Sequence, residues 1–301
     1  MQSAPIDHQH VRRLFARPER LKAIDFLHRE VSARMMERLQ LVKLDPACII
    51  DAGCGRGADL AGLHNLWNAS QIIGVDGSEA LLQVSEQERR AAGLFMQRLF
   101  SKLAGRRDPT DYAGLACGDF AQLPLPPDSA DLLWSNMALH WHSEPDLVFG
   151  EWLRVLRSKG LLMFSCLGPD SLKQVRDAFE PEDQTPHTLP FVDMHDFGDM
   201  LVHAGFATPV MDMEVITLTY TDVDQLFNEV RALGGNPLRS RRSGMLGRSA
   251  WQRIRERLHE MRDRDGRIPL TFEVIYGHAF KPEPSRLGPG ESIIKFDMLR
   301  K

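Results

Sequence analysis

The chain has 301 residues, of which 43% are hydrophobic, 8% aromatic and 26% charged. These fractions are typical of a globular protein and exclude a disordered, collagen-like or disulfide-stapled chain. The 37 lysines and arginines and the 41 aspartates and glutamates give a net charge of −4. That balance argues against bulk binding to nucleic acid, which usually leaves a basic footprint.

Cysteine and histidine spacing gives no sign of a metal site. The cysteines at 48, 54, 117 and 166 form no CxxC pair, and the histidines show no HExxH arrangement. The longest apolar runs are far shorter than the roughly 20 residues that cross a bilayer. The polar N-terminus lacks the apolar core of a secretory signal. We therefore expect no bound metal, no membrane span and a cytoplasmic protein.

Short apolar runs that stop at glycine or aspartate alternate with amphipathic stretches along much of the chain. This alternation is typical of βαβ units with a buried parallel sheet. We expect strands at 47–52, 71–76, just before Gly118, 130–135, 160–165, 215–220 and 270–280, and helices at 20–41, 78–103 and 144–157. The predicted fold class is α/β, with a seven-stranded, mostly parallel sheet and helices on both faces.

We divide the chain into an N-terminal helical segment, 1–45, and a main domain, 46–301. Within the main domain, 222–265 is helical in pattern and holds ten arginines but no lysine. This segment interrupts two strands that otherwise need a short connection, so we expect a lid-like insertion over the active site. The alternative place for the substrate site is the N-terminal helix around residues 20–30. Its arginines are candidates for anchoring an anionic acceptor or docking an acidic protein, or they form a solvated face. We expect a surface helix and loop at 86–112 and an irregular tail at 281–290.

A glycine-rich turn follows the first predicted strand. Gly53, Gly55 and Gly57 come directly after Asp51, and glycines at this spacing let a ligand approach the backbone. An acid before the glycines repels a pyrophosphate and attracts the ammonium of an amino-acid moiety. The turn therefore favours S-adenosylmethionine over a dinucleotide.

Acidic residues also end the next two predicted strands. Asp76 stands about twenty residues after the glycine turn, where a carboxylate can accept both hydroxyls of a ribose. Asp119 follows the third strand, and beside Phe120 it could hold an adenine amino group. Each acid alone could equally be a helix cap or turn residue, but together with the glycines they predict a cofactor site.

The segment 50–57 (Ile-Asp-Ala-Gly-Cys-Gly-Arg-Gly) resembles the glycine motif of class I S-adenosylmethionine-dependent methyltransferases. The segment 130–136 resembles the fourth-strand motif of that family. Asp76 stands where the family contacts the ribose, and Gly118–Asp119 stands where it contacts the adenine. The resemblance implies a Rossmann-like class I methyltransferase fold with S-adenosyl-L-methionine as cofactor. The cofactor-binding residues that it implies are Asp51, Gly53, Gly55, Gly57, Asp76, Asp119 and Phe120.

Two narrower resemblances compete. Residues 134–141 and 266–272 resemble the malonyl-[acyl-carrier protein] O-methyltransferases of biotin biosynthesis. Residues 24–31 and 185–191 resemble a sister family of complex I assembly factors that hydroxylate a protein arginine. The first implies methyl transfer to the free carboxylate of malonyl-acyl-carrier protein. The second implies a protein-arginine hydroxylase, or an assembly factor for a respiratory complex.

Asn136 lies at the carboxyl end of the fourth predicted strand, where open α/β sheets bind their ligands. We expect this residue to face the transferred methyl group as the catalytic residue, with a turn-forming role as the alternative. His140 and Trp141 could wall the acceptor channel, although packing is the other reading of Trp141. A carboxylate acceptor is already ionised at neutral pH, so we expect no general base.

Overall fold

The computed structural model describes residues 5–100 and 112–284. Within these ranges, seven strands form one sheet in the order β3-β2-β1-β4-β5-β7-β6. The strands are β1 (Cys48–Ala52), β2 (Gln71–Asp76), β3 (Ala113–Cys117), β4 (Ala130–Ser135), β5 (Leu156–Leu167), β6 (Ala207–Tyr220) and β7 (Ile268–Phe280). Strands β1 to β5 pair in parallel, and β7 runs antiparallel to both of its neighbours. The predicted seven-stranded, mostly parallel sheet is confirmed.

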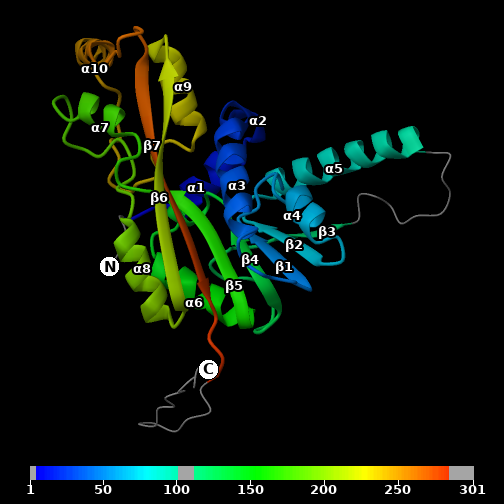
Figure 1. Cartoon of the computed structure of the whole chain (residues 1–301). Helices are drawn as coiled ribbons and strands as arrows, with labels where there is room; N and C mark the ends of the chain where they lie inside the picture. Colours follow the sequence, from blue (N-terminus) through cyan, green and yellow to red (C-terminus); the bar gives the residue numbers. More distant parts are fainter. Residues whose placement is uncertain (1–4, 101–111, 285–301) are drawn as a thin grey trace, which may run out of the picture.

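Helices cover both faces of this sheet (Figure 1). They are α1 (His8–Phe15), α2 (Pro18–Leu21), α3 (Asp25–Leu39), α4 (Leu60–Leu66), α5 (Glu79–Phe100), α6 (Pro145–Val155), α7 (Lys173–Phe179), α8 (Met194–Ala204), α9 (Val223–Ala232) and α10 (Arg248–Glu260). The described ranges also contain two 3₁₀ turns, at Lys22–Ile24 and Leu139–Trp141. The first of these turns divides the helix that we expected over 20–41, so its main part begins at Asp25.

Alternate residues of each central strand pack on opposite faces of the sheet, as the two-residue period of a strand requires. Ile49 of β1 packs in a core cluster with side chains of α3, α4, α9 and α10, whereas its neighbour Ile50 packs with α6 and α8. All five residues of β1 are buried. The central strands are therefore covered on both sides, which explains why they read as unbroken apolar runs.

Strand β6 begins at Ala207, eight residues before the predicted start at Val215. The missed half carries Asp212 and Glu214, which are untypical of a buried strand. Their carboxylates face α3 and form ion pairs with it. A guanidinium nitrogen of Arg38 lies 2.7 Å from a carboxylate oxygen of Asp212, and one of Arg34 lies 2.8 Å from a carboxylate oxygen of Glu214. The two acidic residues that make this strand hard to recognise in the sequence therefore bind it to α3.

The insertion between β6 and β7 belongs to the main core. Leu226 of α9 and both Ile254 and Leu258 of α10 are fully buried in the cluster that also contains residues of β7. From the N-terminal segment, Leu27 and Val31 of α3 join the same cluster. The predicted division of the chain at residues 45 and 46 stays a prediction.

Some expectations fall on residues outside the described ranges. These are the predicted end of the second helix at Leu103, most of the second half of 86–112, and the tail after residue 284. In the part of the chain that the structure describes, no helix is both long and apolar enough to cross a membrane.

Candidate active site

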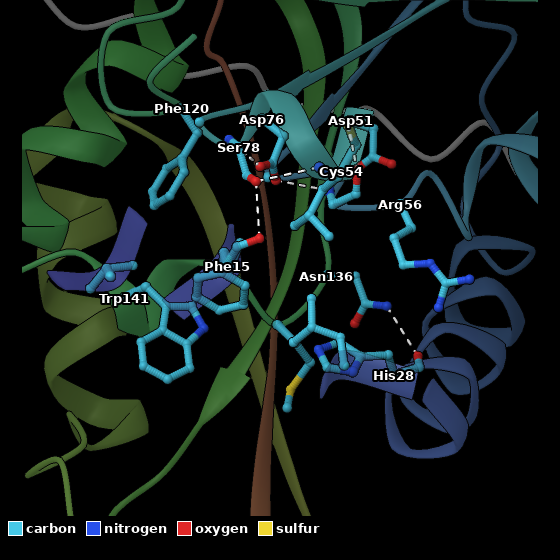
Figure 2. A pocket seen from close by; sticks show the side chains of 18 of the residues that line it. Phe15, His28, Asp51, Cys54, Arg56, Asp76, Ser78, Phe120, Asn136 and Trp141 are labelled. Carbon is cyan, nitrogen blue, oxygen red and sulfur yellow. Dashed lines mark hydrogen bonds between the residues drawn. The ribbon is translucent and has the colours of Figure 1, made fainter. Parts of the chain in front are cut away.

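A cavity opens where β1, β2, β3 and β4 end, next to the point at which the strand order reverses between β1 and β4. Ligands of open α/β sheets bind at such a point because the neighbouring loops separate there. The strand ends contribute Asp51, Gly53, Cys54, Gly55, Arg56, Ala58, Asp59, Asp76, Gly77, Ser78, Leu81, Asp119, Phe120, Asn136, Met137, Ala138, Trp141 and His142. In the view of Figure 2, Asp51 and Asp76 lie at the top of this cavity and Asn136 at the bottom.

The glycine turn has the backbone conformation that its sequence predicts. Gly53, Gly55 and Gly57 all have positive φ values, of 81°, 53° and 72°. A Cβ on Gly53 would lie 2.4 Å from the Cβ of Ala138, and so a side chain cannot be placed there. A Cβ on Gly55 would meet nothing within 4 Å, because this residue faces the open cavity.

Gly57 has a different place from the other two glycines. Among the described residues that line the cavity, it is absent. A Cβ at this position would instead lie 2.4 Å from the hydroxyl of Ser85 and 2.7 Å from Leu60. The requirement for glycine here comes from packing between the turn and helices α4 and α5, and contact of Gly57 with a cofactor stays a prediction.

Asp51 is the most unusual polar group of the cavity. Its side chain is buried, the residue being 2% exposed, and its Oδ2 has no hydrogen-bond partner among the described residues. Burial raises the pKa of the Asp51 carboxyl well above its usual value, and the nearby carboxylates of Asp59 and Asp76 raise it further. A buried carboxylate without a partner is costly, so the site is suited to a cationic group of a ligand.

Asp76 holds the glycine turn against β2. Its Oδ2 accepts the N–H of Gly55 at 2.8 Å, and its Oδ1 accepts the N–H of Ser78 at 2.8 Å. Burial raises the pKa of the Asp76 carboxyl, while these two backbone hydrogen bonds act in the opposite direction. Each oxygen of a carboxylate can accept a further hydrogen bond, so Asp76 can still take a ribose hydroxyl.

Asp119 and Phe120 form the far wall of the cavity. The Oδ1 of Asp119 accepts the N–H of Ala121 at 2.9 Å, and its Oδ2 lies 3.4 Å from the guanidinium of Arg12 in α1. Phe120 is fixed through its backbone, because its carbonyl accepts the indole N–H of Trp152 at 2.9 Å. An acid beside an aromatic ring is the arrangement that the sequence predicts for an adenine.

Asn136 joins three elements at the bottom of the cavity. Its Nδ2 donates to the carbonyl of His28 in α3 at 3.1 Å, and its Oδ1 accepts the hydroxyl of Ser165 in β5 at 2.9 Å. The next residue, Met137, has φ of 55° and donates its N–H to the Ser165 hydroxyl at 3.0 Å. Asn136 thus lies at the predicted edge, where the two ends of its amide hydrogen-bond to α3 and β5, and its role as the catalytic residue stays a prediction.

Helix α1 supplies a wall of the cavity that the sequence does not predict. His8, Val11, Arg12 and Phe15 of α1 line the cavity, and their spacing of three and four residues places them on one helical face. Leu21, Asp25 and His28 continue this wall. The one signal for it in the sequence is that helical spacing, in a segment of only eight residues.

His28 lies at the bottom of this wall. Its Nδ1 lies 3.3 Å from the carbonyl oxygen of Ile24. Because this oxygen can only accept a hydrogen bond, Nδ1 is the nitrogen that carries the hydrogen. Burial lowers the pKa of His28. The tautomer fixed by this contact leaves Nε2 as an acceptor.

Of the two aromatic residues expected around the acceptor, one lines the cavity and the other does not. Trp141 lines the cavity and stacks edge-on against Phe15, with ring centroids 5.2 Å apart. His140 instead lies behind the cavity, where burial lowers its pKa to about 3.

The insertion packs behind the cavity wall and does not line the cavity. None of the described residues that line the cavity belongs to 222–265. Gly234, however, packs on the outer side of Trp141, since a Cβ there would lie 2.4 Å from the indole ring. The insertion is therefore one layer away from the cavity, and its role as a lid stays a prediction.

Ligand chemistry at this site rests on the acids, the glycine turn and the aromatic rings. Among the described side chains, no three His, Cys, Asp or Glu groups are placed to share a metal ion. The orphaned Oδ2 of Asp51 fits an ammonium group, and the open space in front of Gly55 fits a chain that runs along the turn. The residues present are therefore those that S-adenosylmethionine needs.

Comparisons with known proteins give the same result. A family model described as a methyltransferase domain matches residues 50–164. Among solved structures, the YcgJ protein of Bacillus subtilis has a similar fold, with a TM-score of 0.58 at 14% identity, covering 83% of this chain and 98% of that one. Together with the family model, this likeness confirms the class I methyltransferase fold.

Curated relatives cover almost the whole chain. A malonyl-[acyl-carrier protein] O-methyltransferase of Gallionella capsiferriformans is 44% identical over 292 residues, which is 96% of each protein. One of Laribacter hongkongensis is 43% identical, over 90% of this chain and 89% of that protein. The chain therefore belongs to the malonyl-[acyl-carrier protein] O-methyltransferase family and is an S-adenosylmethionine-dependent methyltransferase.

Proposed function

We propose that the chain transfers a methyl group from S-adenosylmethionine to the free carboxylate of a malonyl group carried by acyl-carrier protein, as a step of biotin biosynthesis. The acceptor is taken from the names of the relatives, which are 40–44% identical over at least 90% of this chain. The observation that carries the proposal in the structure is the buried, unpartnered carboxylate of Asp51 at the edge of an open cavity.

In this proposal each strand end holds one part of the cofactor. Asp51 takes the ammonium of the methionine moiety, and the backbone of Gly53 and Gly55 lies along that moiety. Asp76 accepts the ribose hydroxyls. Asp119 accepts the adenine amino group, and Phe120 lies against the ring. Bound there, the cofactor supplies a positively charged sulfonium that carries the transferable methyl group.

The remaining residues of the cavity aim and desolvate the acceptor. A malonyl carboxylate is ionised at neutral pH, so transfer needs alignment and no proton removal. Phe15 and Trp141 present apolar surface beside the cavity and exclude water from that carboxylate. Asn136 fixes α3, and with it His28, at the end of β4. The rate then depends on how well these groups hold the carboxylate in line.

The test is transfer of labelled methyl groups from S-adenosylmethionine to malonyl-acyl-carrier protein. Acetyl-acyl-carrier protein is the matched control, because it has the same carrier and thioester but no free carboxylate. We expect label only on the malonyl form, released by mild alkali as an ester is. Label on the acetyl form, or alkali-stable label on the carrier polypeptide, would contradict a carboxyl acceptor.

A further inference from the structure

Exposed basic side chains lie beside the cavity on its N-terminal side. Residues 12–29 hold six lysines and arginines against two acids, in a chain whose net charge is −4. Four of these basic residues form what we call the N-terminal basic surface: Arg13, Arg17, Arg20 and Lys22, all exposed. Asp25, one of the two acids, is already paired with Arg56 at 2.8 Å. Glu19 is the other, so the surface keeps an excess of positive charge.

This surface borders the entrance because its residues alternate with residues of the cavity wall. Phe15 and Leu21 both line the cavity, and Arg17 and Arg20 stand between them in the chain. The carbonyl of Phe15 accepts the hydroxyl of Ser78 at 3.0 Å, which anchors this part of the chain to the strand ends. A protein held by Arg17 and Arg20 would therefore sit over the cavity.

The side chains of this surface are free to bind a partner. Across the described ranges, Arg17, Arg20 and Lys22 make no side-chain hydrogen bond or ion pair, and Arg13 donates only to the backbone carbonyl of Gln9. Free guanidinium groups can pair with carboxylates in a bidentate manner.

The arginines of the insertion are different, because several are used within the protein. Arg253 and Arg257 both pair with Glu182 at 2.6 Å, and these contacts lower the pKa of Glu182 to about 2. Arg242 pairs with Asp183 at 3.0 Å. These arginines hold α10 and the loop before it to the segment after α7, so they are poor candidates for docking.

We propose that the N-terminal basic surface docks the acidic carrier protein that presents the acceptor to the cavity. The inference rests on the proposed function for the identity of the partner, and it adds where that partner binds. Complementary charge steers two proteins together and raises their association rate by a factor of about 10 to 10³. The same field falls away within about 10 Å at moderate ionic strength.

The experiment compares two double variants with the same change of charge. Arg17→Glu with Arg20→Glu reverses the surface without touching a residue of the cavity wall. Lys43→Glu with Lys159→Glu is the control; Lys43 precedes β1 and Lys159 lies in the first half of β5, toward the amino ends of the parallel strands. The kcat/KM is measured at low and high salt with malonyl-acyl-carrier protein and with malonyl-coenzyme A, which lacks the carrier polypeptide.

We expect the first variant to lose about tenfold or more of its kcat/KM for malonyl-acyl-carrier protein at low salt. That loss should shrink at high salt, and kcat/KM for malonyl-coenzyme A should stay near that of the wild type. The control variant should follow the wild type with both substrates. Equal losses with both substrates, or no loss with either, would overturn the docking surface.

Failure of the proposed function gives a separate result, because wild-type protein would then methylate neither malonyl substrate. Docking is still measurable in that case, by the fluorescence anisotropy of labelled acyl-carrier protein titrated with each variant. Weaker binding by the Arg17→Glu, Arg20→Glu variant alone supports the surface. Equal binding of the carrier by all three proteins refutes it. Basic surfaces can also bind nucleic acid, so single-stranded RNA is titrated in the same way. If the Arg17→Glu, Arg20→Glu variant binds RNA more weakly but the carrier equally well, the surface is not a docking site for the carrier.

Discussion

Replacing Asp51 by Asn should make the ligand-free protein more stable. In the folded state the pKa of Asp51 is raised by burial and by its acidic neighbours, whereas in the unfolded chain it is near 3.8. The folded protein therefore holds this proton to higher pH than the unfolded chain, and stability falls as pH rises from about 4 through the raised pKa. Asparagine removes that loss while keeping the shape of the side chain.

The size of the gain follows from the unpartnered oxygen. A buried polar group without a partner costs about 1–3 kcal/mol, and a charged one more. The variant should gain at least about 1 kcal/mol at neutral pH, which raises the Tm by about 2–4 °C in a large domain. Well below pH 4 the wild-type carboxyl is protonated in both states, so the difference in Tm between the two proteins should disappear there.

Cofactor binding should change in the opposite direction. The ionised carboxylate of Asp51 attracts the ammonium of S-adenosylmethionine, and a charged hydrogen bond contributes about 1.5–3 kcal/mol. The Kd of the Asn variant should therefore rise about ten- to hundred-fold. Wild-type affinity should also increase as the pH rises above about 4 and Asp51 loses its proton, while the affinity of the variant should stay nearly flat over the same range.

Thermal melts and titration calorimetry across this pH range test both statements. Asp59→Asn is the matched control, since it removes a charge from the same cavity and keeps an acceptor for the indole N–H of Trp134, 2.7 Å away. Its effect on the Kd should be much smaller. A ligand-free Asp51→Asn protein that is less stable than the wild type at pH 7, or that binds the cofactor equally well, would refute the assignment of Asp51.

The other predictions concern the glycines and Asp76. Asp76→Ala removes two backbone contacts and the ribose acceptor, so calorimetry should show at least a tenfold higher Kd for S-adenosylmethionine; unchanged affinity would contradict the role. Gly53→Ala forces a Cβ into Ala138 at positive φ and should lower stability by about 2 kcal/mol or more, which an unchanged Tm would disprove. Gly234→Ala and Gly235→Ala both strain the backbone, but only the first meets an indole ring. Turnover should fall in the Gly234→Ala variant alone. Equal turnover in both variants would show that the insertion does not affect catalysis.

The strand ends could be predicted because a parallel sheet brings its carboxyl ends together. Asp51, Asp76 and Asp119 each follow a short apolar run, and topology alone places them around one cavity. The glycine turn is equally local, because its positive φ values depend on residues next to one another in the chain. Gly57 shows the limit of this reasoning, since its packing against Ser85 depends on a helix that begins over twenty residues later.

The start of β6 could not be predicted for a related reason. A strand is recognised in sequence by its apolar face, and Asp212 and Glu214 remove that signal from half of β6. Their partners, Arg34 and Arg38, lie on a helix about 170 residues earlier. Long-range ion pairs of this kind leave no periodic pattern for a single sequence to show.

The sequence predicts a lid from the insertion, and that role stays a prediction; in the structure the N-terminal helices line the cavity and the insertion packs behind them. Ile6 bridges to Leu238, the N–H of Asp7 donates to the carbonyl of Pro237 at 2.9 Å, and the N–H of Arg239 donates to that of Pro5 at 3.0 Å. Helix α1 begins two residues after this bridge and is too short to be stable alone. The loop of the insertion therefore holds the start of the helix whose other residues line the cavity, and changes in that loop should reach the cofactor site through α1.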